Sequence, residues 1–582
     1  MVGLHGLADA RGLKITPSMA EEGYALSVTD EGAVLIAETD AGLFYGVQTI
    51  RQLLEPARGS AQIPRVRIHD WPTMRIRGVH NDQSRGQVPT LETAKRIVDF
   101  CAYYKMNLYG PYIEHTFAWA GHSDIWKGSG AWTAEEFVEL CKYARPRHVM
   151  IVPQFEAFGH QSHILTKERY KHMAETDGWS FAPAVEDTYK LLDDLIGQMD
   201  KAFPFHPYFG IGCDEVYDMG KGKSKELMDK LGGPGHLFAY HITRVNEILH
   251  KYGRRGMMWG DMMLHHPETM QLIPKDVIIL DWHYGAAAHY PSVKRFREAG
   301  FDVVVCPGVS GWVRIFPDLI NAFANIQSIV ADGQEAGALG LMNTSWGDAG
   351  AENFINYNWL PWAWGAACAW ADAHTENPQR FLSRFARTFY GSLSDELARA
   401  QWRLAEAQRA YPWGGWSIEH FHGDPFRGKL ANNLPAPSRI SRFKQLLDEV
   451  EQLLARGEKY ARRNAETLPY LRHALLRLRY VYDRATGLAE AADAYSDAYD
   501  APATSDARRE GITKTVAILR RLRAELAAVR QDFARLWLAE DRPQGLDYDL
   551  RKFDAQLQAY DWAVRQLDEA LKTGQLPDPR SI

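Results

Sequence analysis

The feature of this sequence that most constrains its fold is an alternation of short apolar runs and amphipathic helices between Ile76 and about Asp372. The runs are rich in β-branched and aromatic residues. Several intervening stretches have helical periodicity, and one of them opens on a capping box from Thr133 to Glu136. Eight such runs joined by helices predict a (β/α)8 barrel. The runs are IRGVHND, MNLYGPYIE, VMIVPQFE, YFGIGCDE, GMMWGDM, VIILDWHY, DVVVCPG and LGLMNTSW.

The stretches on either side of this alternation have different patterns. Near the N-terminus, YALSVTDEGAVLIAET predicts a hairpin and AGLFYGVQTIRQLLE predicts a helix. After about residue 395 strand patterns stop, and long stretches show helical periodicity with alternating charge on the outer face. The sequence therefore predicts an α/β chain with a small N-terminal α/β domain over 1–70, a TIM barrel over 71–394 and an all-α domain over 395–582.

Size and charge exclude several classes of partner. The 582 residues carry 67 basic and 73 acidic side chains, a net charge of −6, which argues against nucleic acid or an anionic membrane as the main partner. No apolar run approaches the roughly 18 residues of a membrane span. The N-terminus lacks the basic start and apolar core of a signal peptide, although a trimmed N-terminus would look the same.

The cysteines indicate the compartment. Five of them are scattered through the chain, an odd number with no spacing pattern, so a disulfide framework is not favoured. We therefore expect a reducing, cytoplasmic location. The oligomeric state is not fixed by the sequence, and a homodimer is compatible with it.

Two adjacent carboxylates, Asp214 and Glu215, end the fourth apolar run in HPYFGIGCDEVYDMGKGKS. Neighbouring residues of a regular strand point to opposite faces, but at the strand terminus the backbone can bend and bring both to one cavity. One carboxyl can then stay protonated and act as a general acid while the other stays ionised, as glycosidases require. The alternative interpretation is a salt-bridged pair that caps the strand.

Neighbouring strand ends carry further polar residues. Glu114 ends the second run, and His160 lies just beyond the third. We predict a Glu–His–Glu relay across Glu114, His160 and Glu215 that orients and tunes the general acid. His160 and His163 are also spaced like a metal pair, but no HExxH motif and no third ligand accompany them. The sequence thus predicts neither a metal nor a cofactor.

Tryptophans recur at the ends of the later strands. A pyranose presents flat C–H faces on which indole rings pack well, while polar groups bind its hydroxyls. Core packing would explain any one of these residues, but four at the same end of successive strands indicate a sugar site. The residues are Trp259, Trp282, Trp312 and Trp346.

Four linked motifs carry a resemblance to a known family. They are IPRVRIHDWPTMRIRGVHNDQSRG, YIEHTFAWAGHSDIWKG, VPQFEAFGH and IGCDEVYDMGKGKS. Together they resemble glycoside hydrolase family twenty, the β-N-acetylhexosaminidases, and most of all the branch of cytoplasmic-type exo-N-acetylglucosaminidases with a helical C-terminal domain. The resemblance covers the barrel and the N-terminal domain. It implies exo-acting, retaining removal of terminal β-linked GlcNAc or GalNAc from an oligosaccharide.

The resemblance also implies roles for the residues at the fourth strand. Glu215 would be the general acid and then the general base. Asp214 would hold and polarise the substrate's 2-acetamido group, whose carbonyl oxygen attacks the anomeric carbon to form an oxazoline. A tyrosine normally supports that acetamido oxygen, and Tyr284 is the residue in this sequence best placed to do so.

The implied sugar-binding residues lie on other strand ends. Arg85, in DQSRG, would bind hydroxyls at the non-reducing end, and it is expected on the rim; the alternative is a structural salt bridge to Asp82. Trp259, Trp282 and Trp346 would line the sugar and acetamido pocket, and Asp348 would bind a distal hydroxyl.

Two departures from the family pattern bear on aglycone and hydroxyl preference. Gly210 stands where the family usually has histidine in His-x-Gly-x-Asp-Glu, and Ser310-Gly311-Trp312 stands in place of a Tyr-x-Asp. Two other functions remain open from the residues alone. One is a retaining glycosidase for another sugar with Asp214 as the nucleophile, and the other is a non-catalytic sugar-binding barrel, which the intact acidic pair disfavours.

Overall fold

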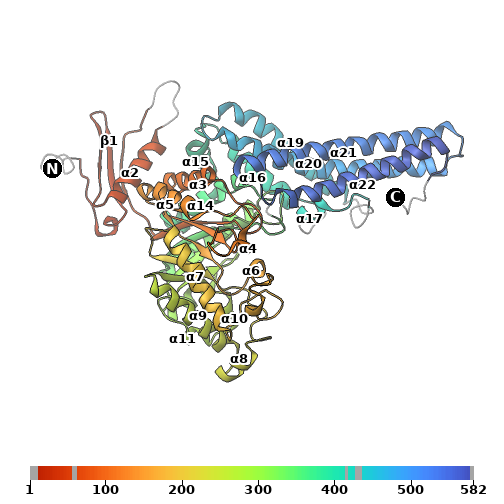
Figure 1. Cartoon of the computed structure of the whole chain (residues 1–582). Coiled ribbons are helices and arrows are strands. Elements are labelled where there is room, and N and C mark those ends of the chain that lie inside the picture. The colour runs from red at the N-terminus through yellow and green to blue at the C-terminus, as the bar shows by residue number, and fades with distance from the viewer. Residues whose placement is uncertain (1–10, 55–61, 351, 413–416, 427–435, 577–582) are drawn as a thin grey trace.

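A computed structural model describes residues 11–54, 62–350, 352–412, 417–426 and 436–576. Figure 1 shows a small N-terminal sheet with its helix, a central barrel, and long helices that extend away from the barrel. These three parts confirm the predicted fold class. The predicted limits of the domains, at residues 70 and 394, stay predictions.

The N-terminal part is a three-stranded antiparallel sheet covered by one helix. In it β1 (Tyr24–Thr29) pairs with both β2 (Gly32–Ile36) and β3 (Val66–Asp70). The predicted hairpin is present, whereas β3 was not predicted. The helix α2 (Asp40–Leu53) begins after Thr39, whose side chain accepts a hydrogen bond from the Gly42 amide.

The central barrel is closed, because β4 pairs with both β5 and β12. Nine strand segments fill eight positions, since β6 and β7 both pair with β5 and are interrupted at Pro153, which has no amide hydrogen to donate. All eight predicted runs form barrel strands. They are β4 (Ile76–Asp82), β5 (Leu108–Ile113), β6 (Met150–Ile151), β7 (Gln154–Phe155), β8 (Tyr208–Gly212), β9 (Arg255–Trp259), β10 (Ile278–Trp282), β11 (Val303–Cys306) and β12 (Gly340–Ser345).

Alternate residues of each strand face the inside of the barrel. Ile278 and Leu280 of β10 belong to the inner apolar cluster, whereas Ile279 packs in the outer cluster beneath the helices. In β9, Met257 and Trp259 face inward in the same way. We call the alternate, inward-facing residues of a strand its inward series. Residues that continue this series past the end of the strand project toward the barrel axis, so the alternation decides which side chains reach the barrel mouth.

Amphipathic helices surround the strands. The predicted capping box is present: Thr133 Oγ1 accepts from the Glu136 amide at 3.3 Å, and the Glu136 carboxylate accepts from the Thr133 amide at 2.9 Å. The main covering helices are α3 (Leu91–Tyr103), α5 (Ala134–Ala144), α7 (Glu186–Ala202), α9 (Pro234–Lys251), α12 (Pro291–Glu298), α13 (Leu319–Ala336) and α14 (Trp359–Trp370).

The C-terminal part is helical, as predicted. Its long helices run side by side (Figure 1), and arginine–aspartate pairs such as Arg523–Asp561 and Arg530–Asp554 join the last two. The final helix, α22, was not predicted as an element of its own. The helices are α15 (Pro378–Tyr390), α16 (Glu396–Arg409), α17 (Ser417–His422), α19 (Pro437–Gly457), α20 (Leu468–Asp500), α21 (Asp506–Glu540) and α22 (Leu546–Thr573). Among the described residues, no helix combines the length and the apolar character needed to span a membrane.

Candidate active site

The inward series of seven strands ends in polar side chains at one mouth of the barrel. In a (β/α)8 barrel the carboxyl ends of the strands form the face where ligands bind. Acidic and phenolic groups therefore meet here, on the inward side. Continuing each series gives Asp82, Glu114, Glu156, Asp214, Asp261, Tyr284 and Asp348.

The backbone leaves the strand conformation where the acidic pair begins. Gly212, Cys213 and Glu215 have φ values of 61°, 69° and 51°, so the chain turns through left-handed conformations at the end of β8. Glu215 lies out of phase with the inward series, and this turn lets it line the same cavity as Asp214. The bend expected from the two adjacent carboxylates is therefore present.

The turn at β8 is held from the neighbouring strand. The Glu156 carboxylate accepts a hydrogen bond from the Cys213 amide at 2.9 Å. It also lies where the Cβ of any larger residue at Gly212 would have to be, so this position requires glycine for both its space and its φ.

His160 lies between the carboxylates that the predicted relay invokes. Its Nε2 is 3.5 Å from Glu215 Oε2 and 3.4 Å from Asp214 Oδ2, and its Nδ1 is 3.8 Å from Glu114 Oε1. The structure thus brings the three predicted residues together and adds Asp214 to them. Burial disfavours the imidazolium, but the neighbouring Asp214 carboxylate outweighs this effect and raises the pKa of His160.

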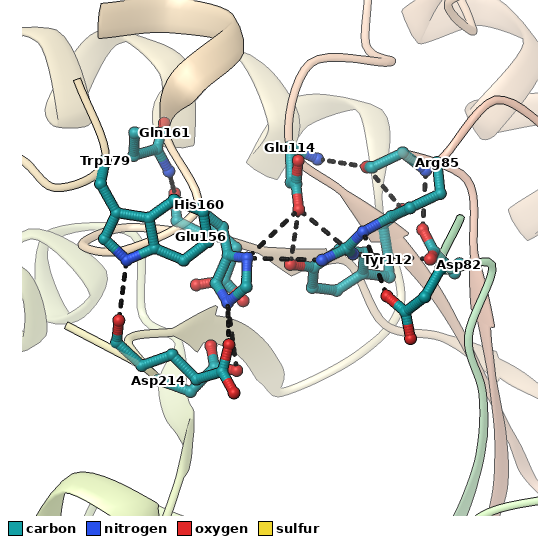
Figure 2. A network of polar contacts seen from close by, with 12 residues as sticks. Asp82, Arg85, Tyr112, Glu114, Glu156, His160, Gln161, Trp179 and Asp214 are labelled. Atoms are coloured by element: carbon teal, nitrogen blue, oxygen red, sulfur yellow. Dashed lines mark hydrogen bonds and ion pairs between the residues drawn. The ribbon is translucent and has the colours of Figure 1, made fainter. Parts of the chain in front are cut away.

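Arg85 sits inside a network of acidic groups rather than on an open rim. Its guanidinium contacts Glu114 at 3.1 Å, Asp82 at 3.5 Å and Asp348 at 4.0 Å, and it lies over the ring of Tyr112 (Figure 2). The salt bridge to Asp82 and a position at the sugar cavity are therefore both present. Burial opposes the charge of Arg85, yet these carboxylates hold its pKa above the usual range.

The pKa values of Glu156 and Asp214 are shifted in opposite directions. Burial and the nearby Asp214 raise the pKa of Glu156 well above its usual range, which favours its protonated form. Burial also works against ionisation of Asp214, but His160 and the hydrogen bonds it receives lower its pKa. Asp214 is therefore the ionised member of this group.

Asp261 adds a third carboxyl to the acidic pair. Its Oδ2 accepts a hydrogen bond from the Glu215 amide at 3.0 Å, and its Oδ1 accepts one from the Trp282 indole at 3.4 Å. It thereby ties the backbone of Glu215 to the aromatic wall of the site. Burial and the charge of Asp214 raise the pKa of Asp261 to about 7.

Aromatic side chains enclose the cavity. The Trp346 indole donates to the Tyr284 hydroxyl at 2.8 Å, and the Tyr284 ring stacks on Trp282 with 5.0 Å between centroids. Trp312 meets Tyr284 edge-on, and Trp259 lies behind Trp346. Burial keeps the pKa of Tyr284 well above its usual range, so its hydroxyl stays a neutral group.

The cavity itself collects nearly all of the predicted site residues. It has a volume of about 100 Å³, and Glu114, the one predicted residue absent from its lining, contacts it through Arg85 and His160. The lining residues are Arg85, His160, Asp214, Glu215, Trp259, Trp282, Tyr284, Trp312, Trp346 and Asp348.

Sequence reasoning missed several residues that support this cavity. Tyr112 and Asp261 continue inward strand series, so strand phase could have found them, and Asp82 was named only as a salt-bridge partner of Arg85. Trp179 could not have been found this way, because it lies in the loop after the third strand. Its indole donates to the Glu215 carbonyl at 2.7 Å, and its ring packs against His160 (Figure 2).

The departure at Gly210 has a steric cause. A Cβ at this position would collide with the side-chain amide of Gln154, which projects from the adjacent strand. Gln154 thus fills the space that the family's usual histidine would need.

The two histidines of the GHQSH motif do not converge on one point. His160 faces Asp214 and Glu215, whereas His163 stacks on His115 with 3.6 Å between ring centroids. The spacing in the sequence therefore does not correspond to a shared ligand position for this pair.

Several known proteins resemble this chain in sequence or in fold. A β-hexosaminidase of Vibrio furnissii is 26% identical over 351 residues, and the match spans 53% of this chain and 55% of that protein. The chain thus spans just over half of that relative's length. The structure of a Flavobacterium johnsoniae chitobiase superposes with a TM-score of 0.56 at 20% identity, over 96% of this chain and 81% of the other. A Vibrio harveyi exo-β-N-acetylglucosaminidase bound to N-acetylglucosamine gives 0.53 at 19% identity, over 66% and 70%. These structural likenesses concern the fold.

Family models identify the chain itself. Residues 75–314 match the catalytic domain of glycosyl hydrolase family 20, and residues 6–71 match domain 2 of the same family. The two matches follow each other along the chain and include the acidic pair, Arg85 and His160. The chain belongs to glycosyl hydrolase family 20.

Proposed function

We propose that this protein is an exo-acting, retaining β-N-acetylhexosaminidase that removes terminal GlcNAc or GalNAc with the help of the substrate's own acetamido group. One observation carries the proposal: Asp214 and Glu215 line one aromatic cavity but have different surroundings. The Asp214 side chain is 12% exposed and lies beside His160 and Glu156, whereas the Glu215 side chain is 35% exposed. A buried, ionised orienting group beside an accessible acid suits this chemistry.

In the proposed reaction Glu215 protonates the leaving oxygen, and then removes a proton from the water that opens the oxazoline. Asp214 accepts a hydrogen bond from the acetamido N–H as that nitrogen gains positive charge. Tyr284, a neutral phenol beside Trp346, donates to the acetamido oxygen. The tryptophans pack on the sugar ring, and Arg85 and Asp348 bind hydroxyls at its non-reducing end.

A panel of aryl β-glycosides tests the proposal. The protein should release aglycone from N-acetyl-β-D-glucosaminides or N-acetyl-β-D-galactosaminides and should leave the 2-hydroxy glucosides and galactosides intact. A thiazoline analogue of the oxazoline should inhibit it competitively, because only an acetamido-assisted site is complementary to that ring. Hydrolysis of 2-hydroxy sugars without thiazoline inhibition would contradict the proposal.

Arg85→Lys should raise KM for an aryl N-acetylglucosaminide by about five- to tenfold with a smaller change in kcat. Lysine keeps the charge that Asp82 and Glu114 require but loses the planar, multi-donor geometry of the guanidinium. Alanine is the wrong probe here, because it would leave buried carboxylates without a partner and destabilise the fold.

Steady-state kinetics and a thermal melt distinguish the two roles of Arg85. Arg297→Lys is the matched control. This arginine pairs with Asp302, which precedes β11, and does not line the cavity. A lower melting temperature with an unchanged KM would mean that Arg85 serves only as a structural ion pair.

A further inference from the structure

The helical C-terminal part reaches the loop that carries Asp348. This loop follows β12, and Glu352 within it is 3% exposed. Its carboxylate accepts from Lys552 at 3.0 Å, lies 2.7 Å from Nε2 of His422, and also pairs with Arg477. Lys552 and Arg477 are cationic partners from α22 and α20, and His422 comes from α17. Three helices of the C-terminal part therefore converge on one carboxylate of a loop at the barrel mouth.

Of the three partners of Glu352, Lys552 also binds the residue that follows Asp348. Its ammonium donates to the carbonyl of Ala349 at 2.6 Å, to Glu352 at 3.0 Å and to Asp549 at 2.7 Å, so all three of its protons have acceptors. Gly350, with φ of 104°, passes so close to Lys552 and Asp549 that a Cβ there would collide with them. The backbone on the C-terminal side of Asp348 is therefore fixed by α22.

The loop that carries Arg85 is held by the same part of the chain. The amide of Arg542 donates to the carbonyl of Val88 at 2.8 Å, and the amide of Thr90 donates to the carbonyl of Glu540 at 3.0 Å. The carboxylate of Glu540 accepts from the amide of Ile355 at 2.9 Å. Glu540 thus joins the loop after β4, through its backbone carbonyl, to the loop after β12, through its buried carboxylate.

These anchors bear on sugar binding because of where Asp348 and Arg85 lie. The two residues face each other at 4.0 Å across the cavity, and the Asp348 side chain is 46% exposed. An exposed carboxylate on a loop has few contacts of its own to fix its position, so the position follows from the backbone beneath it. That backbone is bound to α22.

We propose that the C-terminal helices are a positioning element of the sugar site, in which Lys552 holds the Asp348 loop in the conformation that binds the terminal sugar. This inference rests on the proposed function, because it assigns Lys552 an effect on affinity for the N-acetylhexosamine. Lys552 is a positioning residue, since it acts through Asp348 and lies outside the cavity lining.

Lys552→Met tests this role, since methionine keeps an unbranched stem and removes the ammonium. We expect KM for an aryl N-acetylglucosaminide to rise three- to tenfold and kcat to change less than twofold, because the loop contributes binding rather than chemistry. Glu352 keeps Arg477 and His422 as neighbours, but the buried Asp549 loses its ammonium partner, so a thermal melt must first show that the variant folds. Lys572→Met is the matched control, since Lys572 lies on the same helix and, among the described residues, pairs only with the exposed Glu569.

Hydrogen exchange provides a readout that does not depend on activity. The amides of residues 347 to 350 should exchange faster in Lys552→Met than in the wild type, while those of the barrel strands stay unchanged. Unchanged exchange at this loop, or a rise in exchange throughout the barrel, would overturn the positioning role even if the wild type hydrolysed no N-acetylhexosaminide. Faster loop exchange with an unchanged KM in an active enzyme would also overturn it, whereas an inactive wild type would contradict the proposed function alone.

Discussion

Glu215→Gln is expected to lower kcat by at least about a hundredfold on a β-linked N-acetylglucosaminyl disaccharide, the scale typical of general acid–base catalysis. A sugar alkoxide is a poor leaving group that needs a proton, and glutamine cannot supply one. The glutamine side chain has nearly the same shape as glutamate. The hydrogen bonds of residue 215 with Asp261 and Trp179 are made by its backbone N–H and C=O, so the substitution does not remove them. The site should therefore keep its geometry.

The leaving group decides whether the loss is chemical. A dinitrophenyl glycoside needs little protonation, so its cleavage by the variant should fall far less than that of the disaccharide. Glu226→Gln, on the short helix α8 (Lys225–Leu231), is the matched control, because Glu226 is exposed and Lys230 is its only ion-pair partner in the described part of the chain. Near-normal turnover of the disaccharide by Glu215→Gln would remove Glu215 from the role of general acid.

The barrel could be predicted from the sequence because each of its strands is short, apolar and followed by a change of pattern. Inward and outward positions are both buried in such strands, so periodicity located the runs but did not assign their faces. Asp261 shows the consequence. It follows Trp259 by two positions and so shares its face, but only the assembled barrel shows that it accepts the Glu215 amide.

Residues in loops were predicted only when a motif carried them. Arg85 and Asp348 came from the family resemblance and His160 from its position just beyond the third strand, and the structure brings all three to the mouth of the barrel. Trp179 and Lys552 belong to no such motif and act across long separations in the chain. Lys552 lies more than two hundred positions from the carbonyl it binds, at 349, and no local pattern records a contact of that kind.

The burial of Arg85 among carboxylates illustrates a different limit of prediction from sequence. A motif places an arginine near the sugar, but whether its charge is also needed for stability depends on how many carboxylates surround it. Asp82 ends β4 and Glu114 follows β5, and both contact Arg85 because the two strands are neighbours in the closed barrel. This convergence is a property of the closed barrel rather than of any one segment.

Asp214→Asn is expected to lower kcat on N-acetyl substrates by about 10- to 150-fold, with a smaller effect on KM. The carboxylate is ionised in this site: burial opposes the charge, but His160 and neighbouring hydrogen bonds keep the pKa of Asp214 low. A hydrogen bond to a charged partner contributes about 1.5–3 kcal/mol, and this one strengthens as the acetamido nitrogen becomes positive in the transition state. Asparagine keeps the shape and removes the charge, whereas Asp229→Asn, at an exposed pair with Lys225, should change nothing.

The same residue also decides between the two catalytic routes left open by the sequence. If the acetamido oxygen is the nucleophile, Asp214 only orients it, and no bond forms between the protein and the sugar. A 2-fluoro glycoside, which traps carboxylate nucleophiles, should then leave the mass of the wild-type protein unchanged. If Asp214 attacks the anomeric carbon itself, the intact protein should gain the mass of the fluorosugar, and peptide mapping should place it on Asp214. Such an adduct would reject the substrate-assisted route, because in that route the acetamido oxygen of the substrate, and not Asp214, forms the bond to the anomeric carbon.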